Sequence, residues 1–372
     1  MLVLRTPPPF GGGEIIGLIL REYFVGKCSL LEFTRPRASK RTQGNVSLGN
    51  LWFGLKYIAT TIVRLLITRP QVVYLDLPKN IVAFLRTSFI LVACFLLRVR
   101  VIGDLAGAHF EFLSANPFLN RLGLFFLKRV YRIRVLSRSI KRALTAYELG
   151  NLVSISNGIP DPSTIWQGSK ELSNVANFLY VGKISASKGI RTILEFIDAY
   201  TKEDVVFHVH IVGEWEDRRT QLLVEEIIHS QDISRYVTFH GVLVGEEKWN
   251  VFRRCHVLIH PTYWDGQPVT ILESFAMGLP VIATKVGAIP DTVDHGVTGY
   301  LMKENTAEEI IQGTRMIMGD PETYRRFSGE ARRAYHEKYR VEQFLINMES
   351  LLREALPHAT GNPVSDDGQV IS

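Results

Sequence analysis

The sequence predicts an α/β chain of two Rossmann-like, doubly wound domains that face a cleft. Short apolar runs that suit buried parallel strands alternate with helical patterns through both halves of the chain. With 372 residues, 46% hydrophobic and 22% charged, the chain is long enough for two globular domains. Glycine and polar residues gather directly after the predicted strands, where open parallel sheets bind their ligands.

The predicted domains cover residues 1–160 and 161–340, and a tail rich in Gly, Pro, Ser and Asp, residues 357–372, is expected to be disordered. The first domain is predicted to hold strands at 2–5, 72–75, 99–102, 133–137 and 153–156, and helices at 51–67, 81–97 and 119–131. The second is predicted to hold strands at 178–181, 205–212, 237–242, 257–259 and 281–284, and helices at 246–255, 269–277, 306–318 and 321–335. Three widely spaced cysteines match no zinc or redox spacing, so reduced thiols are expected.

One stretch, residues 260–284, places two acidic residues in a loop followed by a helix. It follows a predicted strand and contains a polar loop, the helix and a second strand. Pro268 suits the first helical position because it has no N–H and a fixed φ, and Gly278 marks the end of the helix. Asp265 lies in the loop and Glu273 about one turn into the helix.

This arrangement suits a ligand with phosphates in its middle and hydroxyl groups at both ends. Gly266 and the free N–H groups of the first helical turn form an anion site. Acidic residues in an anion site would normally repel a phosphate. Their presence is explained if Glu273 accepts hydrogen bonds from a ribose diol and Asp265 accepts one from a sugar hydroxyl. That ligand is a nucleotide sugar. The simpler alternative is a solvated loop acid beside a glutamate that favours a helix start.

The stretch resembles the retaining, family 4 type glycosyltransferases of the GT-B fold, also called glycosyl transferase group 1. Their motif reads E-G-x-P, then l-E-a-m-A-x-G-x-P-V-I-a-T, and this chain reads DGQP, ILESFAMG and PVIAT at the matching positions. Asp265 stands where the family has Glu, and its side chain is one methylene shorter than that of Glu. The resemblance implies the GT-B fold, a helix at 341–356 that crosses back to the first domain, and donor contacts by Gly266, Gln267, Pro268, Val269, Thr270, Ile271 and Glu273.

Two lysines on another loop are placed to neutralise a diphosphate. Lys183 and Lys188 follow the predicted strand 178–181, and the loop resembles the family's v-G-R-l…K-G, whose cations hold the donor diphosphate. The family pattern also implies donor-side contacts by Gly213, after the next strand, and by Val242, near the base. It further matches the glycines Gly11 and Gly12, in a predicted loop at 7–13, to a loop that lines the cleft. A solvated loop is the alternative for the lysines.

The reaction centre departs from the family pattern H-x-H-G-G-x-F. Asp104 replaces the first histidine, and Ala106 stands where the resemblance places the histidine that faces the donor sugar. His109, three residues on, either takes over that role or is an ordinary loop histidine. The catalytic candidates are therefore Asp265, Glu273, Lys188 and His109. No Asp-x-Asp motif follows the strand that ends near Asp76, so neither a metal nor any other cofactor is expected besides the nucleotide-sugar co-substrate.

The two halves of the chain differ strongly in charge. Residues 1–160 contain 22 Lys and Arg against 7 Asp and Glu, a net +15, and residues 161–372 contain 21 against 30, a net −9. A basic half favours an anionic partner, and the absence of nucleic-acid-binding motifs favours a membrane surface or a lipid-linked saccharide acceptor. The expected location is cytoplasmic, with peripheral attachment to the inner face of the cell membrane as an option, and cell-surface polysaccharide synthesis is the expected pathway.

Three other functions remain open on the sequence. A nucleotide-sugar epimerase of this fold would interconvert the donor without an acceptor. A catalytically silent nucleotide-sugar-binding protein would bind the donor without turnover. A Rossmann oxidoreductase is the weakest alternative, since no G-x-G-x-x-G follows the first strand.

Overall fold

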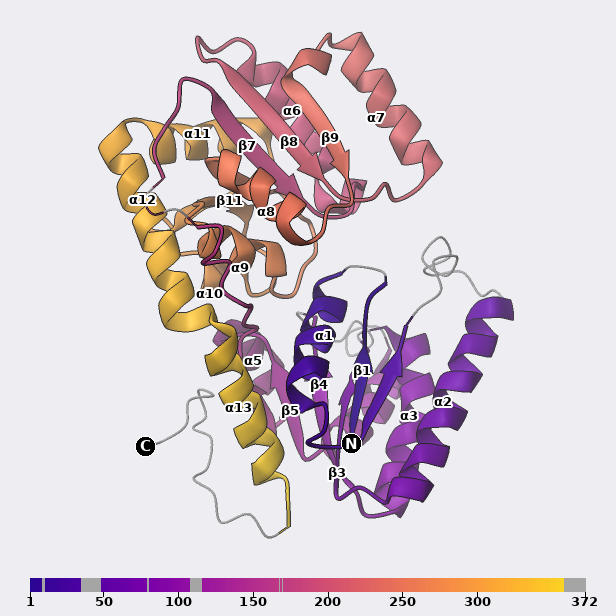
Figure 1. The fold of residues 1–372 in the computed structure, drawn as a ribbon. Coiled ribbons are helices and arrows are strands. Elements are labelled where there is room, and N and C mark those ends of the chain that lie inside the picture. Colours follow the sequence, from indigo (N-terminus) through magenta and orange to yellow (C-terminus); the bar gives the residue numbers. More distant parts are fainter. Residues whose placement is uncertain are drawn as a thin grey trace. The chain divides into compact units, whose positions relative to one another are not determined.

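The computed structural model describes residues 1–8, 11–34, 48–78, 80–107, 116–166, 168 and 170–357. The chain divides into two compact units (Figure 1). Unit 1 comprises Met1–Gly158 and the chain from Val341 onward, and unit 2 comprises Ile159–Arg340. The division after Gly158 lies two residues before the boundary that the sequence predicts, and the helix from Val341 belongs to unit 1. The predicted disordered tail falls, from residue 358 onward, outside the described residues.

Unit 1 contains a parallel six-stranded sheet in the order β2-β1-β3-β4-β5-β6. Its strands are β1 Leu2–Arg5, β2 Leu30–Phe33, β3 Val72–Asp76, β4 Arg100–Leu105, β5 Arg132–Val135 and β6 Leu152–Ser154. Its helices are α1 Gly12–Phe24, α2 Leu48–Thr68, α3 Ile81–Leu96, α4 Pro117–Leu127, α5 Arg138–Thr145 and α13 Val341–Glu354. Within the described residues, no helix is both long and apolar enough to cross a membrane.

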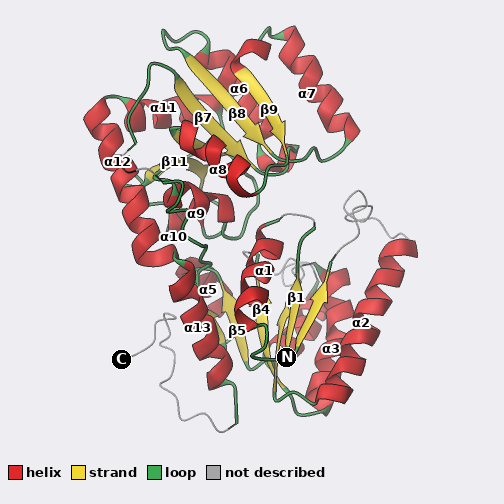
Figure 2. Ribbon diagram, in the orientation of Figure 1, coloured by secondary structure: helices red, strands yellow, loops and turns green. Residues whose placement is uncertain are grey.

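Unit 2 contains a second parallel sheet of six strands, in the order β12-β11-β10-β7-β8-β9. Its strands are β7 Ala176–Val181, β8 Phe207–Val212, β9 Val237–Gly241, β10 Val257–His260, β11 Val281–Thr284 and β12 Gly299–Met302. Its helices are α6 Ile190–Tyr200, α7 Arg218–Ser230, α8 Gly245–Arg254, α9 Val269–Ala276, α10 Ile289–Thr292, α11 Ala307–Met318 and α12 Pro321–Ala334, followed by a π-helical turn at Tyr335–Tyr339. Figure 2 shows the strands of each unit lying between helices.

These two sheets confirm the predicted doubly wound α/β architecture. In unit 2 the strand order reverses between β7 and β10, which are hydrogen-bonded neighbours. At such a reversal the connections from the two strands leave toward opposite faces of the sheet, so a crevice opens beyond their carboxyl ends. The loops that follow β7 and β10 are the ones in which the sequence predicts the ligand site.

The beginning of α1 corrects one prediction. Gly12 and Gly13 lie in the first turn of α1, with Gly11 as its N-cap residue, and not in a loop that continues to residue 13. The glycine run favours a loop, but the apolar side chains that follow it, Ile16, Ile19 and Leu20, are buried at helical spacing. Packing of this face outweighs the low helix propensity of glycine.

A buried ion pair joins the carboxyl ends of β4 and β5 in unit 1. Arg134 Nη1 lies 2.9 Å from Asp104 Oδ2, and the two side chains are only 1% and 6% exposed. The hydroxyl of Tyr74 also donates to Asp104. Arg134 in turn donates to the Ile155 carbonyl at 3.0 Å and to Asn157 Oδ1 at 2.7 Å. Asp104, which replaces the first family histidine, therefore belongs to the structural core.

We expect Asp104→Ala to destabilise unit 1 strongly, because the substitution leaves the Arg134 guanidinium buried without its carboxylate. Breaking a buried pair in this way costs about 3–5 kcal/mol of unfolding free energy, measurable by urea denaturation. Glu148→Ala is the control, since Glu148 pairs with Lys128 at 3.0 Å but is 85% exposed; removing this exposed carboxylate should leave the unfolding free energy nearly unchanged. Equal losses in the two variants would contradict the structural role of the buried pair.

Candidate active site

The candidate site in unit 2 is formed by two loops that follow β7 and β10. The first loop runs from Gly182 into a 3₁₀ turn at Ala186–Lys188 and then into α6. The second runs from Pro261 to Pro268 and into α9. The N–H of Tyr263 donates to the Ser187 carbonyl at 3.0 Å, so the two loops are joined through the backbone. The two loops therefore lie together at the reversal of strand order.

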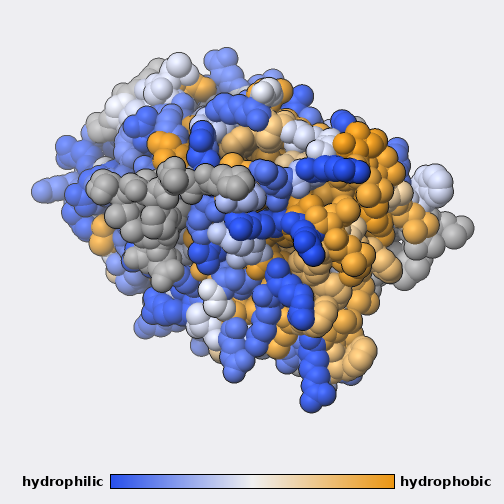
Figure 3. Space-filling view, turned by 90° about the horizontal axis from the view of Figure 1, so that it is seen from below, coloured by the Kyte–Doolittle hydropathy of each residue, from blue (hydrophilic) through white to orange (hydrophobic). Residues whose placement is uncertain are grey.

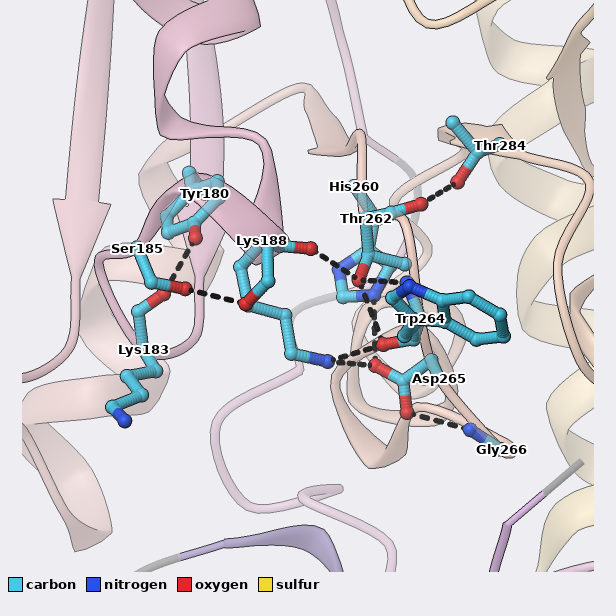
Figure 4. A network of polar contacts seen from close by, with 11 residues as sticks. Tyr180, Lys183, Ser185, Lys188, His260, Thr262, Trp264, Asp265, Gly266 and Thr284 are labelled. Atoms are coloured by element: carbon cyan, nitrogen blue, oxygen red, sulfur yellow. Dashed lines mark hydrogen bonds and ion pairs between the residues drawn. The ribbon is translucent and has the colours of Figure 1, made fainter. Parts of the chain in front are cut away.

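Lys188 and Asp265 form the central ion pair of this site (Figure 4). Lys188 Nζ lies 2.6 Å from Asp265 Oδ2 and donates to the Trp264 carbonyl at 3.0 Å. Burial alone raises the pKa of Asp265, but His260 and Lys188 outweigh it and lower the pKa from 3.8 to about 2. Asp265 is therefore ionised near neutral pH and holds the Lys188 ammonium against the loop.

His260 is a site residue that the sequence analysis missed. It ends β10 and is buried, with Nε2 3.4 Å from Asp265 Oδ2. Within the described residues this nitrogen makes no hydrogen bond of good geometry. Asp265 Oδ1 instead accepts from the N–H of Gly266 at 2.9 Å. The Asp265 carboxylate is thus held from three sides.

Lys183 lies on the same loop as Lys188 but has a different partner. Its ammonium is 3.1 Å from Glu216 Oε1, and its carbonyl accepts from the buried Tyr180 hydroxyl at 2.8 Å. Figure 4 shows its side chain directed away from Lys188. The structure therefore places both predicted lysines on one loop without bringing their ammonium groups together.

Glu273 has a lysine partner that the sequence analysis also missed. Lys248 Nζ, from α8, lies 2.6 Å from Glu273 Oε1, and the two side chains are 16% and 6% exposed. The residues are 25 positions apart on two successive helices, and no motif links them. Lys248 thus holds one oxygen of the Glu273 carboxylate, and the other oxygen can accept hydrogen bonds from a ligand.

The amino-terminal turn of α9 supplies the remaining groups of the site. Pro268 is the N-cap of α9 and not its first helical residue, which corrects the prediction by one position. Its ψ of 119° is extended, and its carbonyl accepts from the N–H of Ile271 at 3.1 Å. The first N–H groups of a helix, here those of Val269 and Thr270, have no partner within it. The Thr270 hydroxyl is buried and has no hydrogen-bond partner in the described part of the chain.

Three other predicted donor-binding residues, Gln267, Gly213 and Val242, follow strands at this edge of the sheet. Gln267 is buried, and its amide donates to the Thr292 hydroxyl at 3.3 Å, so its side chain braces α10. Gly213 follows β8 with a φ of 152°, and a Cβ there would lie 1.7 Å from the Gly182 carbonyl oxygen. Only glycine therefore permits this approach of the loops after β7 and β8. Val242, just after β9, is 51% exposed.

Four residues of unit 1 were also predicted to lie at or near the site: Gly11, Gly12, Ala106 and His109. Gly11 and Gly12 open α1, and Ala106 follows β4 as an exposed residue. The catalytic candidate His109 lies outside the described residues. The contribution of unit 1 to catalysis therefore stays a prediction.

Part of the chain that contains this site matches a known protein family. Residues 165–334 match the model of the family described as glycosyl transferases group 1. N-acetyl-alpha-D-glucosaminyl L-malate synthase of Bacillus anthracis is 23% identical over 267 residues, which are 70% of this chain and 69% of the relative. A putative colanic acid biosynthesis glycosyltransferase, WcaL of Salmonella typhimurium, is 28% identical over 135 residues, 35% of this chain and 33% of the relative. The chain spans about half the length of other curated relatives that it matches.

A solved structure extends the similarity to both units. The crystal structure of Anabaena Alr3699/HepE in complex with UDP-glucose aligns with a TM-score of 0.73 at 15% sequence identity, covering 95% of this chain and 100% of the other. The fold is thus GT-B, as the resemblance implies. The match to glycosyl transferases group 1 lies within unit 2, so the comparisons show the GT-B fold for the chain and the group 1 family for residues 165–334.

We expect the low pKa of Asp265 to make its ion pair with Lys188 stabilising above about pH 4, the ordinary carboxyl range. A carboxyl whose folded pKa lies below its unfolded pKa stabilises the folded state at higher pH. This stabilisation is lost as the pH falls through the folded value, here about 2. The difference in unfolding free energy between wild type and Asp265→Asn should therefore be constant above about pH 4, on the order of 2–3 kcal/mol, and should decline between about pH 4 and 2.

Urea titrations of both proteins at several pH values would measure this difference. A difference that stays constant down to the lowest pH at which the wild type is folded would show that Asp265 is not held by Lys188 and His260.

Proposed function

We propose that the protein transfers a sugar from a UDP- or GDP-sugar to a saccharide or lipid-linked saccharide acceptor, with retention of configuration and without a metal. The observation that carries the proposal is the pair of carboxyl side chains, Asp265 and Glu273, each with a lysine at 2.6 Å, beside the amino terminus of α9. A diphosphate needs cations and free N–H groups, and the hydroxyl groups of ribose and sugar need acceptors. This edge of the sheet offers both.

Each side chain has a place in this scheme. Glu273, with Oε1 held by Lys248, would accept from the ribose diol through its other oxygen. Asp265 would accept from a hydroxyl of the transferred sugar. Lys188 uses two of its three N–H groups on Trp264 and Asp265, which leaves the third for a phosphate oxygen. Lys183 and the first N–H groups of α9 would complete the diphosphate site.

The reaction follows from where charge develops. The bond between the anomeric carbon and the phosphate oxygen breaks, and the leaving diphosphate gains negative charge that Lys188 and the helix N–H groups stabilise. The acceptor oxygen forms the new glycosidic bond on the same face of the sugar. Its proton passes to the departing phosphate oxygen, so this scheme needs no further basic side chain.

Two observations support the proposed acceptor and the proposed location at the membrane: the basic first half of the chain and the description of a relative. WcaL is described with colanic acid biosynthesis, and residues 1–160 have a net charge of +15. Both support a saccharide acceptor, or one linked to a lipid diphosphate, at the inner face of the cell membrane. Cell-surface polysaccharide synthesis is the pathway that this acceptor class favours.

We expect a selective rise in melting temperature with one of UDP, GDP or ADP and its sugar conjugates. Ligand at about 100 times its Kd adds about 2.7 kcal/mol to the folded state. Glu273→Gln should weaken binding of the nucleotide because it removes the charged acceptor for the ribose diol. The variant Glu226→Gln, at an exposed position of α7, is the control. No shift with any nucleotide would overturn the donor assignment.

Loss of the Lys188 ammonium should lower kcat/KM by about tenfold or more, since a charge-assisted hydrogen bond contributes about 1.5–3 kcal/mol. Lys188→Ala would be compared with Arg191→Ala, whose side chain lies one helical turn away and is 82% exposed. Turnover is followed as nucleoside diphosphate release with candidate acceptors, and nuclear magnetic resonance of the product gives its anomeric configuration.

Unchanged turnover in Lys188→Ala would contradict the assigned role of Lys188. Donor interconversion without an acceptor would indicate an epimerase, and binding without turnover a silent binding protein.

A further inference from the structure

The outward surface of α2, α3 and α4 in unit 1 is apolar. We call it the apolar face, and it is defined by exposed side chains on these three helices. On α2 they are Trp52, Leu55, Val63, Leu66 and Ile67; on α3, Leu85, Phe89, Val92 and Leu96; on α4, Phe118 and Phe125. Trp52, Phe118 and Leu96 are 71%, 71% and 79% exposed. Single exposed apolar residues are ordinary, but a contiguous set of this kind marks an interaction surface.

The pattern on α3 shows that its exposure is organised. Leu85, Phe89, Val92 and Leu96 recur at helical spacing and form one exposed stripe. On the opposite side of the same helix, Phe84, Leu91 and Cys94 are fully buried against the sheet. A surface helix of a water-soluble domain ordinarily presents charged or polar side chains outward. α3 is apolar on its buried side and on its exposed side.

α2 repeats the pattern beside α3. Trp52, Leu55, Val63 and Leu66 lie on one exposed stripe, whereas Thr61 and Leu65 on the other side are fully buried. α2 packs against α3, and α3 also contacts α4. Figure 3 shows a broad hydrophobic area on this side of unit 1, crossed and edged by protruding hydrophilic side chains.

The charged residues of these helices all have one sign. The sequences of α2, α3 and α4 contain no aspartate or glutamate. Exposed basic side chains lie on or directly after them: Lys56, Arg64, Arg69, Arg98 and Arg121. Long basic side chains can keep their charge at a polar boundary while their methylene groups extend along apolar surface. The apolar face therefore has a positive rim.

We propose that the apolar face docks onto an anionic lipid bilayer, with its apolar side chains in the boundary between headgroups and acyl chains and its basic rim on lipid phosphates. Partly inserted apolar area and adjoining basic residues are the two features that bind surface helices to anionic membranes. The proposal goes beyond the donor chemistry and does not depend on it, since none of these residues belongs to the candidate site.

A second copy of the chain fits the same face less well. In a two-fold dimer the face would meet itself, so the basic rim of one protomer would lie near that of the other. With no acidic residue on α2, α3 or α4 to compensate, this contact would be repulsive. A bilayer that contains anionic lipid supplies the opposite charge and an apolar interior together.

The test is flotation of the full-length protein with vesicles of phosphatidylcholine alone and of phosphatidylcholine with about one third phosphatidylglycerol. Phe89→Ser combined with Leu96→Ser removes apolar side chains and leaves the net charge unchanged. Arg64→Gln combined with Arg98→Gln removes two rim charges. The matched controls are Leu223→Ser with Ile346→Ser, which are 56% and 49% exposed outside the face, and Arg191→Gln with Arg325→Gln.

We expect the wild type to float only with the anionic vesicles and to be released by high salt. The rim variant should lower the partition coefficient roughly 30-fold, about fivefold for each basic residue. The serine variant should lower it by more than about tenfold for each side chain. The two control variants should bind as the wild type does, and melting temperatures should show that all variants are folded.

Absence of flotation, or equal losses in the face variants and their controls, would overturn the proposal. Concentration-dependent dimerisation that Phe89→Ser with Leu96→Ser abolishes would overturn it in favour of a second copy. Nucleotide binding is measured on the same preparations. Donor binding without flotation refutes the membrane face alone, and flotation without donor binding refutes the proposed function alone.

Discussion

The arrangement of the candidate site depends on the neutralisation of two carboxylates by two lysines. Asp265 and Glu273 lie in a loop and helix where a diphosphate is also expected, and without partners they would repel it. Each has an ammonium group at 2.6 Å. Neither lysine lies in the loop or helix that contains its carboxylate partner. Lys188 follows β7, and Lys248 lies on α8. The site is thus assembled only when the parallel sheet places β7 and β10 side by side.

Neutralisation also explains why acids are retained at the amino terminus of a helix. Each lysine offsets the repulsion that its carboxylate partner would exert on a nearby phosphate, while the carboxylate keeps lone pairs for hydroxyl groups. Lys188 contributes N–H groups on one side of Asp265, and the Gly266 amide holds the other oxygen of the same carboxylate. The donor site that we propose would thus accept both hydroxyl groups and phosphates. These are the two kinds of group that alternate along a nucleotide sugar.

Much of the fold could be predicted because it depends on local pattern. The strands at 2–5 and 281–284 have the predicted bounds, and the α9 region agrees to within one residue. α1 was missed because three glycines concealed an apolar face that only tertiary packing makes decisive. For the site, motif residues such as Asp265 and Glu273 were found through the order of strand, loop and helix.

The partners of these residues could not be found in the same way. Lys248 is 25 residues from Glu273, and Glu216 is 33 residues from Lys183, so each pairing depends on how helices and loops pack and leaves no local signal. The predicted strand stops at residue 259, and His260, the first residue of the stretch 260–284, was assigned no role. The Asp104–Arg134 pair illustrates the same limit in unit 1, where register across β4 and β5 joins residues 30 apart.

The distribution of charge along the chain distinguishes binding of a small phosphorylated ligand from binding of a membrane surface, which net charge alone does not. The excess of +15 in residues 1–160 suggests at first a site for a phosphorylated ligand. In unit 2, however, the lysines at the candidate donor site are each matched by a carboxylate: Lys188 by Asp265, Lys248 by Glu273 and Lys183 by Glu216. In unit 1, by contrast, α2, α3 and α4 carry basic residues and no acidic ones, beside apolar side chains that face outward. Paired charge in one place suits the recognition of one small molecule in a fixed orientation.

Basic charge without acidic residues beside it, spread over an apolar surface, suits an extended partner with many phosphates. For such a partner the exact position along the surface does not matter.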